Sequence, residues 1–278
     1  MSVRALAIDW SLDGPVGAAF LALTVAIGAL YLAAAGAGRR RDRRGRPWPR
    51  GRTACFLAGL TILGLDLYSG VGSLADTWLS VHMVEHMVIW VIVAPLLAAG
   101  APVRLALYSL PRAGRFRLAR WLRSPLVAAL TGGIGSVTLF GAVVLVSHVP
   151  AVYGLALSND YVHEAEHALY LFTALLVWAP LVGADPLPHR PGTRGQLACM
   201  AACMVPMGLI ALWLATASHP VYGRYLEAAG TAALHDQRIA ATIMWAGCLP
   251  AFAVPALRLF PVPPRRRVQH VTSHHVAA

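Results

Sequence analysis

The sequence predicts an all-α, polytopic membrane protein with seven transmembrane helices. Hydrophobic residues make up 58% of the 278 residues and charged residues only 13%, and the mean hydropathy is +0.61. These proportions are typical of a chain embedded in a bilayer, and they exclude a soluble enzyme built around one large core. Several apolar stretches are also long enough to cross a hydrocarbon layer of about 30 Å, which takes roughly 20 helical residues.

The predicted transmembrane helices follow one another with short connections. They cover approximately residues 15–37, 51–70, 79–99, 125–147, 162–183, 196–216 and 236–258. The basic run near the first stretch follows it instead of preceding it, so we expect a retained helix and not a cleaved signal peptide. Residues 1–260 are therefore expected to form a single seven-helix transmembrane domain. Residues 261–278, which open with several prolines, are expected to form a disordered cytoplasmic tail.

The distribution of arginine predicts the orientation. The chain has no Lys, and 20 of its 23 Arg follow the first, third, fifth or seventh predicted helix. The positive-inside rule then places the amino terminus outside and the carboxyl terminus in the cytoplasm. Ten of the 12 acidic residues fall near the opposite, outer side, where they would attract cations. A basic inner face beside anionic lipid explains the net charge of +11, so we expect a lipid bilayer as a partner and no nucleic acid.

Two five-residue motifs lie at the starts of the third and fifth predicted helices. They read His82-Met83-Val84-Glu85-His86 and His163-Glu164-Ala165-Glu166-His167. Histidines four residues apart lie on one face of a helix, so each pair can offer two imidazoles to one ion. Both helices are predicted to run from the outer to the inner side of the membrane, so the two histidine pairs are expected at similar depth. If the helices are neighbours, four imidazoles converge just below the outer surface.

These patterns predict a metal site, against the alternative that the histidines are polar packing groups between helices. The expected ligands are His82, His86, His163, His167 and His148. Met83, Glu85 and Glu166 are candidates for accessory ligands or for groups that orient a histidine ring. Asp66 and Asp236 lie near the outer ends of their helices, where they would either attract or gate the ion or act as capping and solvated carboxylates.

The metal is not decided by the ligand types alone. Imidazole suits zinc, copper, iron and nickel, whereas a thioether shifts the preference towards Cu(I). The four cysteines are Cys55, Cys199, Cys203 and Cys248, and none falls in an outer loop, so an outer disulfide is not expected. Cysteines and methionines in the sixth and seventh helices are expected to be lipid-facing or core residues, with a sulfur-lined path for Cu(I) as the alternative.

Four blocks of sequence, in order between about residues 55 and 258, resemble the CtaG-type cytochrome c oxidase assembly factors, a bacterial seven-span family. The blocks are His82-Met83-x-x-His86 with Ala94-Pro95-Leu96-Leu97, His148-Val149-Pro150, His163 to His167 with Trp178-Ala179-Pro180 and Asp185-Pro186, and Asp236-Gln237 with Ile243-Met244-Trp245. The chain departs from the family pattern at Ser147, Ala179 and Ala241, but the ligand-type residues are intact.

The resemblance implies a protein of the bacterial cell membrane, not an enzyme, that handles copper for a haem-copper cytochrome c oxidase. Its expected partners are an oxidase subunit and a periplasmic or extracellular copper donor. Two alternatives remain open from the residues themselves. His163-Glu164-x-x-His167 also matches the pattern of zinc hydrolases, in which glutamate acts as the general base. A copper permease is the third possibility, although the third and fifth helices are almost wholly apolar below their first turns.

Overall fold

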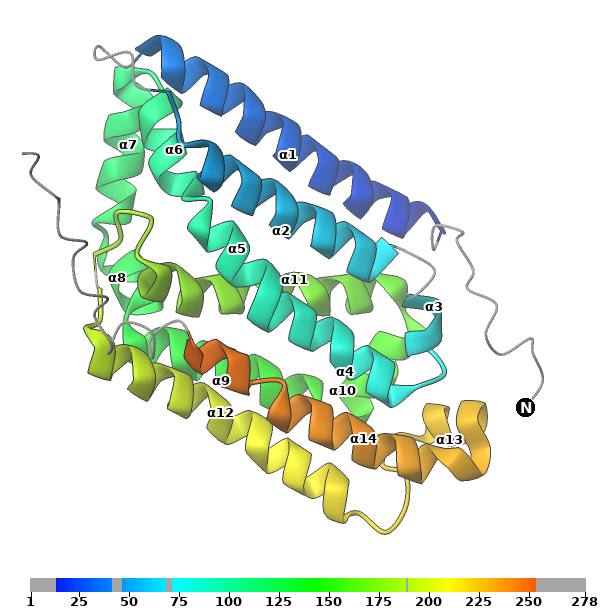
Figure 1. The fold of residues 1–278 in the computed structure, drawn as a ribbon. Coiled ribbons are helices and arrows are strands. Elements are labelled where there is room, and N and C mark those ends of the chain that lie inside the picture. The colour runs from blue at the N-terminus through cyan, green and yellow to red at the C-terminus, as the bar shows by residue number, and fades with distance from the viewer. Residues whose placement is uncertain (1–13, 42–46, 69–71, 189, 254–278) are drawn as a thin grey trace, which may run out of the picture.

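The computed structural model describes residues 14–41, 47–68, 72–188 and 190–253. All regular structure in these ranges is helical, which confirms the predicted all-α class (Figure 1). The elements are α1 (Gly14–Arg41), α2 (Arg50–Tyr68), α3 (Gly72–Ala75), α4 (Leu79–Val88), the π-helix η2 (Ile89–Val93), α5 (Ala94–Ala99), α6 (Pro102–Ser109), α7 (Arg112–Leu122), α8 (Pro125–Thr131), α9 (Gly133–Ser147), α10 (Pro150–Ser158), α11 (Asp160–Val182), α12 (Thr193–Thr216), α13 (Gly223–Ala229), η3 (Gly230–Ala232), α14 (Ala233–Ala246) and η4 (Leu249–Phe252). The predicted tail at 261–278 lies outside the described residues.

Four helical stretches in the described ranges are long and apolar enough to cross a membrane. They are Val16–Ala37, Leu79–Ser109, Asp160–Val182 and Thr193–Thr216, and α8 with α9 makes a fifth if that bent pair is one span. These five match five of the seven predicted helices. The predicted second helix corresponds to α2, which is not among them, and the predicted seventh begins in α14 and extends past the last described residue. The structure thus shows four or five candidate spans.

The predicted fourth helix is broken in two. The axes of α8 and α9 differ by 65°, and the break falls at Gly132 and Gly133. A Cβ atom at Gly132 would lie 2.9 Å from the Ala128 carbonyl oxygen, and one at Gly133 would lie 2.9 Å from the Cys199 sulfur. The sharp bend therefore requires residues without side chains.

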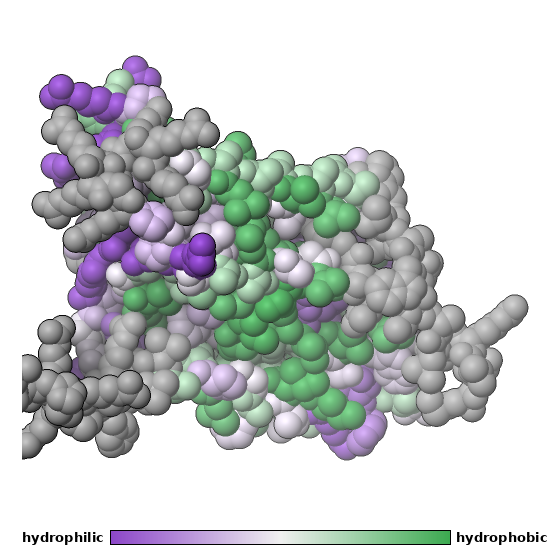
Figure 2. All heavy atoms as spheres, turned by 45° about the horizontal axis from the view of Figure 1, so that its top comes forward, coloured by the Kyte–Doolittle hydropathy of each residue, from purple (hydrophilic) through white to green (hydrophobic). Residues whose placement is uncertain are grey.

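The long helices lie side by side, with short helices at both ends of the bundle (Figure 1). α6, α7 and α8 gather at one end, and α3, α10 and α13 at the other. The face shown in Figure 2 has a broad hydrophobic band across its middle, and the coloured hydrophilic residues gather mainly towards the two ends. That pattern is typical of a protein whose flanks face lipid.

The third predicted helix is interrupted by one π-helical turn. Pro95 has no N–H to donate to the carbonyl of Val91, so the regular hydrogen-bond ladder cannot continue there. The indole N–H of Trp178 on α11 donates to the Trp90 carbonyl at 2.7 Å. This bond joins α11 to the π-helical turn that follows the first histidine motif, and it fixes the two motif-bearing helices against each other.

Candidate metal centre

The first histidine motif occupies most of the short helix α4, and the second lies in the first half of α11. Each helix start is held by side-chain hydrogen bonds. The Asp236 carboxylate on α14 accepts from the backbone N–H of Ser80 at 3.1 Å and also from its hydroxyl. The Asn159 side chain accepts from the N–H groups of Tyr161 and Val162 at 3.0 and 3.3 Å. Both caps satisfy donors that a helix start leaves open, so the histidines project from ordered backbone.

The structure brings all four motif histidines together. Within the motifs, the ring centroids are 4.5 Å apart for His82 and His86, and 4.3 Å apart for His163 and His167. Between the helices, the His82 ring lies 5.4 Å from that of His163, and the His86 ring lies 5.3 Å from that of His167. α4 and α11 therefore present their histidines to a common point, which the sequence analysis expected only if the two helices were neighbours.

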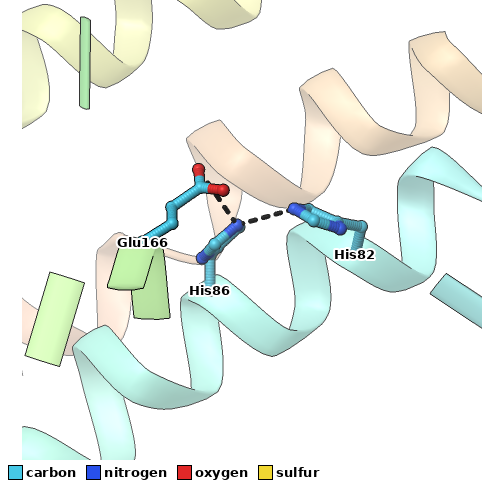
Figure 3. A group of neighbouring side chains, drawn as sticks. All are labelled: His82, His86 and Glu166. Atoms are coloured by element: carbon cyan, nitrogen blue, oxygen red, sulfur yellow. Dashed lines mark hydrogen bonds and ion pairs between the residues drawn. The ribbon is translucent and has the colours of Figure 1, made fainter. Parts of the chain in front are cut away.

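Glu166 joins His82 and His86 in the tightest part of this histidine cluster (Figure 3). One nitrogen of each histidine and one Glu166 oxygen all lie within 4.8 Å of one another. The two Nε2 atoms are 2.7 Å apart, and the Glu166 Oε1 atom is 4.0 Å from His86 Nε2. Imidazole nitrogens that bind one ion at about 2.0–2.1 Å in tetrahedral geometry lie about 3.3 Å apart, so a small separation of the two rings would accommodate the ion.

The cluster contains buried polar atoms that have no hydrogen-bond partner among the described residues. These atoms are Nδ1 of His82 and His86, both ring nitrogens of His167 and both carboxylate oxygens of Glu166. Buried polar groups in proteins are almost always paired, so each exception needs an explanation. The Nε2 atoms of His82 and His86 and the Glu166 carboxylate face one another in this buried site (Figure 3). Imidazole and carboxylate ligands suit a cation of the first transition series, and the residues present therefore fit a metal ion.

His148 lies beside the cluster with one nitrogen already engaged. Its Nδ1 atom is 2.8 Å from the carbonyl oxygen of Val144, which can only accept, so Nδ1 carries the proton. Its Nε2 atom is consequently a lone-pair donor, and it is buried without a hydrogen-bond partner in the described structure. Metal-binding histidines commonly use a backbone carbonyl in this way to fix the tautomer and the ring orientation. His148 is outside the tight group of His82, His86 and Glu166, but the lone pair of its Nε2 atom also suits it to bind a metal ion.

A cavity of about 270 Å³ adjoins the histidine cluster. Its lining includes three of the histidines and four carboxylate residues: His82, His163, His167, Asp76, Glu85, Asp160 and Glu164. Acidic groups around a cavity raise the local concentration of cations. Glu85, expected either as an accessory ligand or as a ring-orienting group, thus lies along this cavity, whereas Glu166 lies against the His86 ring.

The other three expected accessory residues lie apart from the cluster. Met83 is 2% exposed and belongs to the apolar core. Asp236 binds Ser80, which supports the capping alternative for this carboxylate. Asp66 on α2 does not line the cavity, and its buried Oδ2 atom has no hydrogen-bond partner among the described residues.

Aromatic residues that the sequence reasoning missed as site residues enclose the histidines. The Tyr170 ring is 4.3 Å from that of His86, and the Tyr153 ring is 5.2 Å from that of His82. Tyr222 stacks on Tyr153 at 4.0 Å and donates its hydroxyl to the His148 carbonyl at 3.1 Å. Tyr170 follows His167 by three residues, and that helical spacing was a usable signal. Tyr222 reaches the site only through the tertiary fold.

The comparison with known families agrees with this arrangement. The sequence profile of the family described as cytochrome c oxidase caa3 assembly factor (Caa3_CtaG) matches residues 29–262. The chain belongs to this family. The matched range includes both histidine motifs, His148 and the aromatic residues around them, so the predicted resemblance is confirmed across most of the chain.

Curated relatives of this caa3 assembly factor family member come from mycobacteria. Uncharacterized proteins of Mycobacterium bovis and Mycobacterium tuberculosis are each 28% identical over 247 residues, and one of Mycobacterium leprae is 27% identical over the same length. The alignments cover 85% of this chain but only 36% of each relative, so the chain spans about a third of the length of these proteins. No solved structure matches the chain.

Proposed function

We propose that this membrane protein binds copper at the outer ends of α4 and α11 and passes it to a haem-copper oxidase during assembly. The observation that carries the proposal is the convergence of His82, His86, His163 and His167 from two helices. Ring nitrogens of His82, His86 and His167 are buried there without a hydrogen-bond partner among the described residues. The choice of copper rests on membership of the oxidase assembly family and on the affinity of imidazole for copper.

The proposal includes a topology of seven transmembrane helices in a bacterial cell membrane, with the amino terminus outside. The four or five candidate spans support part of this count. The proposal takes the predicted second and seventh helices, at about 51–70 and 236–258, as the remainder. The arginine-rich helix α7 lies at the opposite end of the bundle from α10 and α13 (Figure 1). The positive-inside rule then makes the histidine end extracytoplasmic.

In this proposal the residues collect, hold and release the ion. The carboxylates of Asp76, Asp160 and Glu164 attract a cation that a periplasmic or extracellular donor delivers. The imidazoles replace the ligands by which the donor held the ion. Tyr153 and Tyr170 keep bulk water away from the imidazoles. Because the ion is cargo, the site must leave room for an incoming ligand from the oxidase subunit, and the cavity provides that room.

A zinc-dependent hydrolase is the second candidate. One observation favours it: Glu164, which takes the place of a general base in the His163-Glu164-x-x-His167 pattern, lines the same cavity as both histidines. Against this, the tightest group of possible ligands is His82, His86 and Glu166, and it includes neither member of the second histidine pair. We therefore propose a binding protein and not an enzyme, and the bound metal and turnover together distinguish the two.

The experiment that tests the proposal is metal analysis of the purified chain after exposure to equal copper and zinc. We expect the wild type to retain copper, and we expect His82→Ala/His86→Ala and His163→Ala/His167→Ala each to lose it. His219→Ala is the matched control, because this histidine is exposed and its ring nitrogen contacts Ser218. Equal copper in all four proteins would show that the site is wrong, and zinc together with amide hydrolysis would favour the hydrolase.

A deletion strain tests the second half of the proposal. Loss of assembled haem-copper oxidase, with other respiratory enzymes unchanged, is expected from a role in assembly. Complementation with the His82→Ala/His86→Ala variant should fail where the His219→Ala variant succeeds. If the paired-histidine variant restores the oxidase fully, copper binding at this site is not the means by which the protein acts.

A further inference from the structure

Sulfur-containing side chains are concentrated on three helices, α4, α12 and α14. All six methionines after Met1 and three of the four cysteines lie on α4, α12, α14 or the residue that follows Gly247. α14 packs against both α4 and α12. The sequence alone favours lipid-facing or core positions for these residues, but the fold places several of them in contact.

One sulfur pair joins α12 to the residue that precedes η4. The Cys248 thiol is 3.3 Å from the Met207 thioether sulfur, and both residues are buried. Cys203 precedes Met207 by one helical turn on the same face of α12 and is 1% exposed. Two thiols and one thioether therefore surround a single buried region.

This region is next to the histidine cluster in the fold. Met87 directly follows His86 in α4, and it packs over Gly247: a Cβ atom at Gly247 would lie 3.2 Å from the Met87 methyl carbon. The glycine lets the thioether side chain approach the backbone immediately before Cys248. One methionine thus separates the imidazole ligands from the thiols.

We propose that Cys203, Met207 and Cys248 form a second metal site, which takes a soft monovalent cation such as Cu(I). Thiolate and thioether are the ligands that Cu(I) prefers, and neither favours a hard cation. One thiolate, one thioether and Cu(I) make a complex without net charge, which lowers the cost of placing an ion inside an apolar core. Binding displaces one thiol proton and involves no electron transfer.

The site is independent of the proposed function, because its ligands come from α12 and the end of α14 and not from the histidine motifs. Copper that the histidines hold and copper that the thiols hold can therefore be counted separately. A histidine site is lost in His82→Ala/His86→Ala, and the sulfur site should survive that change. The converse applies to Cys203→Ser/Cys248→Ser.

The test is titration of the purified full-length protein with Cu(I) in competition with a chromogenic Cu(I) chelator. We expect Cys203→Ser/Cys248→Ser to bind one Cu(I) fewer than the wild type and His82→Ala/His86→Ala to retain that ion. Cys55→Ser is the matched control, because this thiol lies on α2, and it should bind as many ions as the wild type. An unchanged ion count in Cys203→Ser/Cys248→Ser would overturn the proposal.

Met207→Leu serves if the double cysteine variant does not fold, because exchange of methionine for leucine conserves volume in a core. We expect this variant to keep the wild-type melting temperature and to lose affinity for one Cu(I) by at least about tenfold. X-ray absorption of the His82→Ala/His86→Ala variant with one equivalent of Cu(I) should show sulfur neighbours. Unchanged affinity in Met207→Leu, or a spectrum with nitrogen neighbours alone, would contradict the site.

Discussion

The indole N–H of Trp178 donates to the main-chain carbonyl of Trp90 across 2.7 Å, and this bond joins the two helices that carry the histidine motifs. Trp90 lies in the π-helical turn that Pro95 imposes on the third predicted helix, one turn past His86. The bond links the irregular backbone of one motif helix to a side chain of the other. π-helical turns frequently accompany functional sites, and here the turn supplies the carbonyl that fixes the distance between the histidine pairs.

Replacement of Trp178 by phenylalanine should loosen the histidine cluster while leaving every imidazole in place. The buried Trp90 carbonyl would lose its side-chain partner, which costs about 1–3 kcal/mol, and α11 would gain freedom to shift relative to α4. We expect copper affinity to fall by about tenfold, which is typical when a group that supports metal ligands is removed. Thermal unfolding and chelator competition measure the two effects.

Trp245→Phe is the control for this change, because Trp245 is 62% exposed on α14. It should alter neither the melting temperature nor the copper affinity. If Trp178→Phe lowers stability but leaves copper affinity at the wild-type value, the bond supports the fold and does not position the ligands.

Variants of Asp236 distinguish two roles for its carboxylate, capping the start of α4 and attracting the ion. Asp236→Ala removes the acceptor for the Ser80 N–H and hydroxyl groups, and loss of a helix cap costs about 0.5–2 kcal/mol. Asp236→Asn removes the charge but keeps an oxygen acceptor. We expect Asp236→Asn to resemble the wild type in melting temperature and in the rate of copper uptake, and Asp236→Ala to unfold earlier.

Ser80→Ala provides the partner for a double-mutant cycle with Asp236→Ala. Because the two side chains share a hydrogen bond, their effects on the free energy of unfolding should be less than additive. Copper uptake that slows in Asp236→Asn, with unchanged stability, would instead favour attraction of the ion by this carboxylate.

The sequence predicts the parts of the site that depend on helical periodicity. The length of the apolar stretches predicts the helices that the structure shows as α4 and α11. The spacing of four residues places His82 with His86, and His163 with His167, on one face of their helix. Whether these two helices lie side by side depends on the tertiary fold, and the sequence analysis could state their proximity only as a condition. The resemblance to the assembly factors added an expected metal, copper, and an expected partner, the oxidase.

Long-range contacts account for what the sequence did not predict. The bond between Asp236 and Ser80 joins residues 156 positions apart, and Tyr222 reaches the His148 carbonyl from 74 positions away. The break at Gly132 has a local cause, but the apolar pattern continues across it and concealed it. The position of Glu166 beside the His86 ring likewise depends on where α4 lies in the fold. The sequence alone therefore left two roles open for Glu166, an accessory ligand or a group that orients a histidine ring.

Tyr153 is expected to protect the histidines as a neutral phenol. Burial, first of all, and the neighbouring Tyr225 hydroxyl raise the pKa of Tyr153 well above its usual range, so the side chain stays protonated at neutral and mildly alkaline pH. Tyr153→Phe should therefore keep copper affinity near the wild-type value. Tyr153→Ala removes the ring from His82 and leaves a cavity, which costs about 3–5 kcal/mol for a large aromatic residue.

Stopped-flow release of copper to a chelator measures the effect of the Tyr153 ring. We expect release from Tyr153→Ala to be about tenfold faster, because water reaches the imidazoles. Tyr161→Ala is the control, since Tyr161 is 71% exposed at the start of α11. A copper-to-phenolate absorption band that disappears in Tyr153→Phe would show that the tyrosine is a ligand after all.

Asp185 should make stability depend on pH at the opposite end of the bundle. This buried carboxylate follows α11 and accepts from the Arg104 N–H at 2.7 Å. Burial raises the pKa of Asp185, and the hydrogen bonds from the Arg104 and Val103 backbones oppose that shift. A raised native pKa means that the native state holds the proton more tightly than the unfolded state, so stability falls as pH rises from about 3.9 through the native pKa.

Asp185→Asn removes this titration but keeps an acceptor, so its free energy of unfolding relative to the wild type should increase across the same pH range. Asp185→Ala leaves the backbone donors of α6 unpaired and should be less stable than Asp185→Asn by about 1–3 kcal/mol at every pH. Denaturant unfolding in detergent between pH 4 and pH 8 gives both comparisons. A constant difference between wild type and Asp185→Asn over that range would mean that the pKa of Asp185 is the same in the native and unfolded states.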